Sequence, residues 1–139
     1  MALTFHPRRG TVLMCDFTTG FQVPEMTKIR PVVVISGTIS PGVCTVIPLS
    51  TTAPVPPQNW HHLLAPASLP APFQAQPTWA KCDMVATVSL KRLDRVRIGK
   101  DSNGKRLYAA VRINSFDMAS LEQCLLHVFC LRHLTKPPS

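Results

Sequence analysis

The run at positions 28–36 constrains the fold of this chain more than any other stretch. It joins a basic tripeptide and a proline to three consecutive valines and an isoleucine at 32–35. β-Branched side chains are stiff at χ1 and suit a pleated, buried backbone, so this run predicts a central β-strand. Pro31 has no N–H for a ladder and holds the preceding residue extended, so we expect it to open the strand with Arg30 at its mouth. On this stretch alone, Arg30 is more often a solvated charge than a ligand for a substrate.

The balance of charges indicates a polyanionic partner. Fifteen Lys and Arg residues stand against seven Asp and Glu residues, which gives a formal net charge of +8 over 139 residues. Nucleic acid is the first candidate for such a partner, but an acidic protein or an anionic membrane surface fits the charge equally well. A hydrophobic fraction of 45% is ample for one domain with one core and argues against general disorder.

The cysteines suggest neither a disulfide framework nor a zinc site. They are five in number and form no CxxC pair, so we expect buried, reduced thiols and no metal or other cofactor. The N-terminal residues lack the order of regions that a secretion signal requires, and no apolar run approaches membrane-spanning length. We therefore expect a cytoplasmic, soluble protein that is not embedded in a membrane.

The remaining composition divides the chain into strands, one irregular section and a terminal helix. Strands are expected at 11–17 and 44–49 on either side of the central run, and strand composition resumes at 79–85. Seven of the fourteen prolines fall within 52–77, which excludes a long helix or a central strand there. Because that section also contains Trp60 and several leucines, we expect an ordered excursion with one short strand at 60–64.

Two further elements follow the excursion. The Asn103-Gly104 pair between alternating runs predicts a hairpin within 95–113, since both residues tolerate positive φ. Arginines alternate with apolar residues along its arms, so one face is cationic, and a plain solvated face is as good an explanation as a nucleic-acid surface. Beyond the hairpin, Asn114 or Ser115 can cap a helix in which apolar residues recur at helical spacing.

The common catalytic motifs are missing from the sequence. It contains no glycine-rich phosphate loop, no HExxH, no GxSxG and no cysteine–histidine metal spacing. His61 and His62 are adjacent rather than at ligand spacing, so a surface or hydrogen-bonded pair is expected.

What remains is a set of polar residues at the ends of expected strands. Alternation along a strand would place Lys81 and Asp83 on one face and Cys82 on the other. A cation and a carboxylate on one face can serve as acid and base across a phosphodiester. Cleavage of RNA needs a base for the 2′-hydroxyl, a donor for the leaving 5′-oxygen and positive charge for the phosphorane. A plain cross-strand ion pair is the commoner explanation of the same pattern.

The order of several short motifs resembles the PemK/MazF family, the toxin components of bacterial toxin–antitoxin systems, which are sequence-specific endoribonucleases. The matching stretches are Arg-Gly-Thr-Val at 9–12 with Asp-Phe at 16–17, Arg-Pro-Val-Val-Val-Ile-Ser at 30–36, Val-Ile-Pro-Leu-Ser-Thr at 46–51, Cys-Asp-Met at 82–84, Thr-Val at 87–88, Arg-Leu at 92–93 and the C-terminal helix. They cover most of the chain.

The resemblance implies a mainly β fold, an SH3-like barrel of the PemK/MazF/CcdB type with a C-terminal α-helix, and a single domain over 1–139. It also implies a homodimer, metal-independent cleavage of single-stranded RNA and neutralisation by a cognate antitoxin protein. Arg30 falls on the arginine that stabilises the phosphate, and Ser50 on a substrate-site hydroxyl. Asp83 falls on the general base of the PemK-like branch, and Lys81 on that branch's proposed acid. The other substrate-binding positions it implies are Gln22, Glu25, Thr51, Thr87 and Arg92.

The chain also departs from the family pattern. The loop at 20–30 is longer than usual, and Gln22 stands where an acidic residue is common, a role that Glu25 can take over. Lysine at 81 keeps a charge but loses the bidentate fork of arginine, and Ala86 replaces a common arginine. The excursion at 52–77 and the hairpin at 95–113 exceed the compact pattern. Two alternatives therefore stay open: a catalytically inactive barrel that binds nucleic acid or a protein partner, as the gyrase-poisoning CcdB toxins do, and a domain with a purely structural role.

Overall fold

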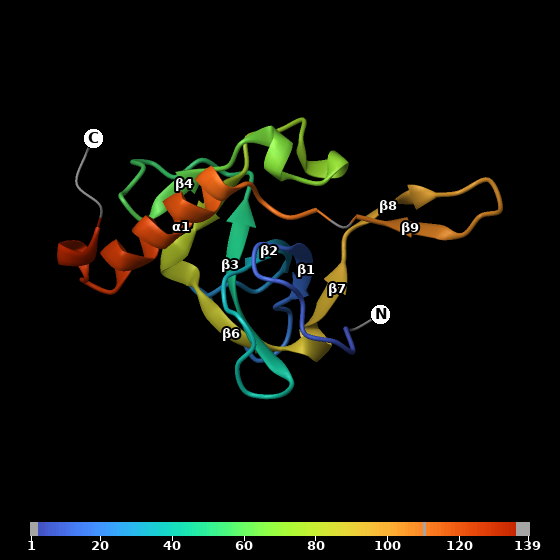
Figure 1. The fold of residues 1–139 in the computed structure, drawn as a ribbon, viewed down its shortest axis with the longest axis horizontal. Helices are drawn as coiled ribbons and strands as arrows, with labels where there is room; N and C mark the ends of the chain where they lie inside the picture. The colour runs from blue at the N-terminus through green and yellow to red at the C-terminus, as the bar shows by residue number, and fades with distance from the viewer. Residues whose placement is uncertain (1–2, 110, 136–139) are drawn as a thin grey trace.

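The computed structural model describes residues 3–109 and 111–135. Its main sheet is antiparallel, with strand order β4-β5-β3-β2-β1-β7 and with β6 paired to β3. The strands are β1 (Val12–Asp16), β2 (Ile29–Val34), β3 (Val43–Ser50), β4 (His61–Leu63), β5 (Trp79–Lys81), β6 (Ala86–Ser89) and β7 (Leu93–Arg95). A second sheet is the hairpin of β8 (Arg97–Lys100) and β9 (Arg106–Tyr108), which projects from the body on the side away from helix α1 (Ser115–Val128) (Figure 1).

Five of the strands curve around one apolar core. They run in the order β6-β3-β2-β1-β7, and the first and last of them are consecutive in the chain, joined by the single 3₁₀ turn η4 (Leu90–Arg92). This is the expected SH3-like arrangement, and the expectation of a mainly β fold with a C-terminal helix is confirmed. Two of the three residues of η4, Lys91 and Arg92, are basic.

The β-branched run is explained by burial on both faces of β2. Val32 and Val34 belong to the core inside the barrel, together with Phe17 and Val46. Val33 faces the other way, into a second core beneath α1 that includes Leu121. All three valines are fully buried, so neither face of the strand tolerates a polar residue.

The prediction that Pro31 opens its strand was wrong, because β2 begins at Ile29. The backbone bonds from Phe17 N to Lys28 O (3.2 Å) and from Val34 N to Thr11 O (3.0 Å) show that even-numbered residues of β2 bond to β1. Pro31 therefore points its nitrogen toward β3, whose pairing with β2 covers only positions 32–34. A proline is tolerated there because the ladder on that side has ended.

The prediction of one strand over 79–85 was also wrong. β5 ends at Lys81 and the chain makes the 3₁₀ turn η3 (Cys82–Met84). The reason lies in β3, which pairs with β6 as far as Val46 and with β5 from Leu49 onward. The chain must leave the ladder between these two pairings, so alternation does not relate Lys81 to Asp83.

The proline-rich excursion is ordered and includes the expected short strand, β4. Two 3₁₀ turns follow it, η1 (Pro66–Ser68) and η2 (Ala71–Phe73), and Leu64 and Leu69 are buried in the core beneath α1. Asp117 of α1 fastens this section to the helix: its carboxylate accepts hydrogen bonds from Ser68 Oγ (2.5 Å) and Ala65 N (3.1 Å), and lies 2.7 Å from His62 Nε2. His62 is thus a hydrogen-bonded residue, as expected.

The capping and hairpin predictions are confirmed, and the paired arms of the hairpin are shorter than the expected span of 95–113. Asn114 Oδ1 caps α1 by accepting from Asp117 N at 2.7 Å. Gly104 adopts a positive φ of 77° in the hairpin turn. The five cysteines are all unpaired, and four are buried as expected, but Cys130 is exposed because it lies past the end of α1. Within the described residues no helix is long and apolar enough to span a membrane.

Candidate functional site

Arg30 lies at the open end of the barrel, opposite Cys15 of β1. It has the same parity as Val32 and Val34, so it belongs to the strand face that lines the barrel interior. Continuing the β2–β3 register by two residues places it opposite Ser50. Its Nε atom is buried and has no hydrogen-bond partner in the part of the chain that the structure describes. A buried N–H without a partner is costly, which marks Arg30 as a donor that a ligand could satisfy.

A cavity of about 180 Å³ opens at the same end of the barrel, and two carboxylates line it. Asp83 reaches it from η3 and Glu25 from the loop after β1, and both residues are exposed. Phe17 and Phe21 are among the apolar residues of its wall, with ring centroids 5.1 Å apart in an edge-to-face arrangement. Phe17 is the residue that relates the cavity to Arg30, since it lies just after β1, two residues beyond Cys15, and belongs to the same interior core.

Ser50 is the last residue of β3, and Lys81 is the last residue of β5, which pairs with this end of β3. Trp79 pairs with Ser50, and Lys81 is the last residue of the same strand, so all three have one parity. Ser50 is only 5% exposed, and its Oγ accepts a hydrogen bond from Thr52 N at 3.1 Å. This bond shapes the turn after β3 and leaves the neighbouring Thr51 exposed.

The loop at 20–30, which is longer than the family pattern, is closed by a reciprocal pair of hydrogen bonds between Gln22 and Glu25. Glu25 N donates to Gln22 O at 2.7 Å, and Gln22 N donates to Glu25 Oε1 at 3.0 Å. The structure therefore brings Glu25 to the cavity beside Asp83, while Gln22 serves as the partner that orients it. Gln22 itself does not line that cavity.

Arg92 contacts the residues at the start of the same loop. Its Nη1 donates to Asp16 O at 3.0 Å, and its guanidinium lies 4.9 Å from the centroid of the Phe21 ring. A Cβ built on Gly20, which has a φ of 81°, would lie 3.2 Å from Nη2 of Arg92, so the glycine allows this close approach. Arg92 thus holds one wall of the cavity in place.

Of the predicted site residues only Asp83 and Glu25 line the cavity, and Thr87 faces away from the barrel interior. Its Oγ1 lies 2.7 Å from Thr45 Oγ1 on a cross-strand pair of β6 and β3. Val88 and Val46, their neighbours in sequence, face the barrel interior, so the two threonines face outward.

Residues that sequence reasoning missed complete the site. Phe17, Phe21 and Met26 line the cavity, and their clustering depends on how the loop folds back over the barrel end. The pairing of Phe21 with Arg92 has no local signal, because 71 positions separate them in the printed sequence. Asp16 at the end of β1 keeps a lowered pKa, chiefly because the side chain of Thr18 and then its backbone N–H donate to the carboxylate.

The arrangement suits general acid–base chemistry on a phosphodiester. A carboxylate that is exposed in a small cavity can accept a proton, and an arginine on a rigid strand can meet developing negative charge. Within residues 3–109 and 111–135, no group of three or more His, Cys, Asp or Glu side chains is arranged to hold a metal ion.

Comparison with known proteins identifies the family. A family model described as the PemK-like, MazF-like toxin of type II toxin–antitoxin systems matches residues 8–129. The chain belongs to this toxin family. Among curated relatives of the toxin, YifN of Escherichia coli (strain K12) is 36% identical over 116 residues, covering 70% of this chain and 78% of YifN.

Solved structures agree with the toxin fold. MazF from Deinococcus radiodurans superposes with a TM-score of 0.63 at 14% identity, covering 91% of this chain and 98% of MazF. An endoribonuclease from a mycobacterial species gives a TM-score of 0.60 at 16% identity, covering 90% and 92% of the two chains. The Mycobacterium tuberculosis toxin MazF-mt6 gives 0.58 at 16% identity, covering 87% and 97%. At these identities the likeness establishes the fold of the PemK/MazF-like toxin, and its chemistry must be argued from its own residues.

Proposed function

We propose that the protein is a toxin-type endoribonuclease that cleaves single-stranded RNA without a metal, by attack of a 2′-hydroxyl on the adjacent phosphodiester. The observation that carries the proposal is the open end of the barrel, where exposed Asp83 lines a cavity whose wall residue Phe17 lies two residues beyond Cys15, the β1 partner of Arg30. Membership of the PemK/MazF-like family supports it, as does the likeness to structures named endoribonucleases or MazF toxins.

The proposed reaction uses three charged groups. Asp83 takes the proton of the 2′-hydroxyl, and the oxygen so formed attacks the neighbouring phosphorus. Arg30 donates hydrogen bonds to the phosphorane oxygens, where its unpartnered buried Nε gains an acceptor. Lys81 gives a proton to the leaving 5′-oxygen as the P–O bond breaks. The products are a 2′,3′-cyclic phosphate and a free 5′-hydroxyl. This step consumes no water and requires no metal.

The remaining predicted residues take supporting roles in the proposal. Ser50 positions rather than contacts the substrate, because it is 5% exposed and its Oγ holds Thr52 N. Glu25 supplies the second carboxylate of the cavity, oriented by Gln22. Arg92 fixes Phe21 as a wall of the site, and exposed Thr51 is available to an RNA strand.

We also propose that the toxin acts in the cytoplasm as a homodimer and is neutralised by a cognate antitoxin protein. Structures of MazE–MazF from Deinococcus radiodurans, one with a TM-score of 0.57 at 13% identity, support a partner of this kind. The formal charge of +8 suits both an RNA substrate and an acidic antitoxin segment.

The test is cleavage of a labelled single-stranded RNA by the purified protein in EDTA. We expect cleavage by the wild type, and a loss of roughly 100-fold or more in Arg30→Ala and Asp83→Asn, the scale of general acid–base and electrostatic contributions. Arg132→Ala and Glu122→Gln remove charges of the same two signs at exposed positions outside the cavity and should leave the rate unchanged.

Two results would contradict the proposal. One is cleavage at the same rate by the Arg30 and Asp83 variants. The other is intact RNA after prolonged incubation; if salt-sensitive binding of that RNA persists, the protein is an inactive barrel that binds nucleic acid.

A further inference from the structure

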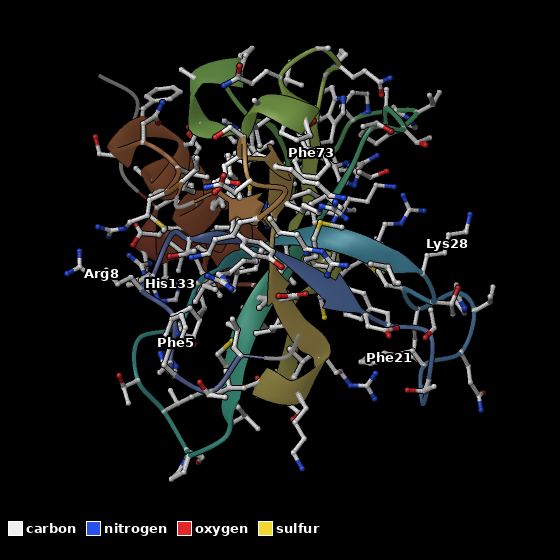
Figure 2. All side chains as sticks on the ribbon, turned by 90° about the vertical axis from the view of Figure 1, so that its right-hand side faces the viewer. Phe5, Arg8, Phe21, Lys28, Phe73 and His133 are labelled. Carbon is white, nitrogen blue, oxygen red and sulfur yellow. The ribbon has the colours of Figure 1, made fainter. Side chains whose placement is uncertain are left out.

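A second cavity, of about 460 Å³, lies away from the candidate active site. It is formed where the N-terminal segment before β1 meets the end of β7 and the segment after β9. Figure 2 shows Phe5 and Arg8 of this cavity on one side of the barrel, and Phe21 of the active-site cavity with Lys28 on the other. We call it the basic cavity.

The residues lining the basic cavity combine positive charge with an aromatic ring. Arg8, Arg95 and Arg112 are all exposed, and the lining contains no Asp or Glu. Phe5 is 57% exposed, and the buried Leu13 lies in the wall. An exposed phenylalanine beside three arginines has no role in the hydrophobic core and is suited to a ligand with both a flat apolar face and negative charge.

Two of the three arginines are already held in position. The guanidinium of Arg95 lies 4.0 Å from the ring centroid of Tyr108, so it is stacked on an aromatic face. Arg112 donates from Nε to Arg9 O at 3.1 Å, which ties it to the N-terminal segment. Groups fixed before binding lose little side-chain freedom when a ligand arrives, which favours affinity.

Positive charge continues outward from the basic cavity along the β8–β9 hairpin. Arg97, Lys100, Lys105 and Arg106 are all exposed on it. The one carboxylate of the hairpin, Asp101, accepts from the backbone N–H groups of Asn103 and Lys105, both at 2.9 Å, and so closes the turn. The hairpin therefore extends a cationic path by which an anionic strand could leave the cavity.

We propose that the basic cavity binds one nucleotide of single-stranded RNA, with the base against Phe5 and the phosphate between Arg8, Arg95 and Arg112. The volume is that of a small-molecule site, and stacking of a base on an aromatic ring beside arginine is how proteins hold unpaired RNA. An acidic peptide would satisfy the arginines but would leave the ring of Phe5 without a flat partner. The choice of RNA as ligand rests on the proposed function. An RNA that occupies both the active-site cavity and the basic cavity must run across the barrel. An RNA long enough to reach both cavities therefore binds more tightly than a short one.

The test is fluorescence anisotropy with a labelled 2′-O-methyl oligoribonucleotide, which lacks the attacking hydroxyl and is not cut. We expect Phe5→Ala to weaken binding about five-fold or more, the scale of losing one stacked base. Arg8→Gln should weaken binding to all sequences and lower the slope of log affinity against log salt by about one.

Matched controls come from the opposite end of the chain. Phe129 is 58% exposed, almost the same as Phe5, and Arg132 is exposed as Arg8 is. Phe129→Ala and Arg132→Gln should change the affinity less than two-fold. Both cavity variants alter exposed side chains, and thermal unfolding at the wild-type temperature verifies that they are folded.

The outcomes separate this inference from the proposed function. If the wild type fails to cut RNA but binds the oligonucleotide through Phe5 and Arg8, the inference stands and the nuclease proposal falls. If it cuts RNA while Phe5→Ala and Arg8→Gln bind like the controls, the inference is wrong. It is also wrong if poly-aspartate binds the wild type as tightly as the oligonucleotide and loses as much affinity in Phe5→Ala.

Discussion

His62 Nε2 and Asp117 Oδ1 lie 2.7 Å apart, although 55 positions separate the two residues in the chain. The Asp117 side chain is 1% exposed and also accepts from Ser68 Oγ and Ala65 N. Ser68 Oγ in turn accepts from Asn114 N at 3.0 Å, immediately before α1. One carboxylate therefore connects β4, the first turn of the helix and η1, and it fixes the proline-rich excursion against α1.

Replacing Asp117 should lower stability strongly. Asp117→Ala leaves the buried Ser68 hydroxyl and the Ala65 N–H without their acceptor, and we expect the free energy of unfolding in urea to fall by about 3 kcal/mol. Glu122→Ala is the control, because its ion pair with Arg9 (2.8 Å) joins side chains that are 47% and 40% exposed. It should cost less than about 1 kcal/mol. Equal losses in the two variants would contradict the assigned role of Asp117.

The N-cap of α1 should make a smaller, separate contribution. Asn114→Ala removes the oxygen that accepts from Asp117 N, and we expect a loss of about 1 kcal/mol in the same urea experiment. Asn114→Asp retains a side-chain acceptor and should stay closer to the wild type. A fully stable Asn114→Ala would show that this cap does not stabilise the helix.

Arg92 should control the order of the loop that forms the active-site wall. Arg92→Ala removes the bond to Asp16 O and the contact with Phe21, so we expect faster amide hydrogen exchange over 17–26 and slower RNA cleavage. Lys91→Ala, at the exposed neighbouring position, is the matched control and should leave exchange in the loop unchanged. Unaltered protection in Arg92→Ala would exclude the proposed anchoring.

Thiol reactivity should report burial. Cys130 is exposed, whereas Cys15, Cys44, Cys82 and Cys124 are buried. Burial also raises the pKa of Cys15 to about 12 and raises that of Cys44, which lowers their thiolate fraction further. Maleimide at neutral pH should label the native chain once, and Cys130→Ser should abolish the labelling. Rapid modification of a second cysteine in the native protein would contradict this burial pattern.

Local sequence signals predicted those parts of the fold that depend on near neighbours. The β-branched run at 32–35, the Asn103-Gly104 turn and the Asn114 cap each act through their own backbone, so they could be located without the structure. The errors at Pro31 and at 82–84 have a different origin. Pro31 is tolerated because the β2–β3 pairing has ended before it, and the turn at 82–84 forms where the partner of β3 changes from β5 to β6. Both points are decided by pairings between strands that are distant in the sequence.

The sequence located the charged residues of the candidate site but not its aromatic wall. The short motifs indicated Arg30 and Asp83, and the structure brings Asp83 and Glu25 to one cavity. Phe17, Phe21 and the anchoring of Phe21 by Arg92 arise only when the loop folds over the barrel end. Thr87 followed the family pattern but faces outward, because its parity on β6 opposes that of Val88.

The chemistry of the cut ends tests the proposed reaction most sharply, and mass spectrometry can read it after incubation of the toxin with a defined RNA in EDTA. We predict a 5′ fragment that ends in a 2′,3′-cyclic phosphate and a 3′ fragment that begins with a free 5′-hydroxyl. An otherwise identical RNA with a single 2′-deoxy sugar at the cut position should stay intact, because the attacking group is gone. A 5′-phosphate on the product, or cleavage at the deoxy position, would contradict attack by the 2′-hydroxyl and with it the role assigned to Asp83.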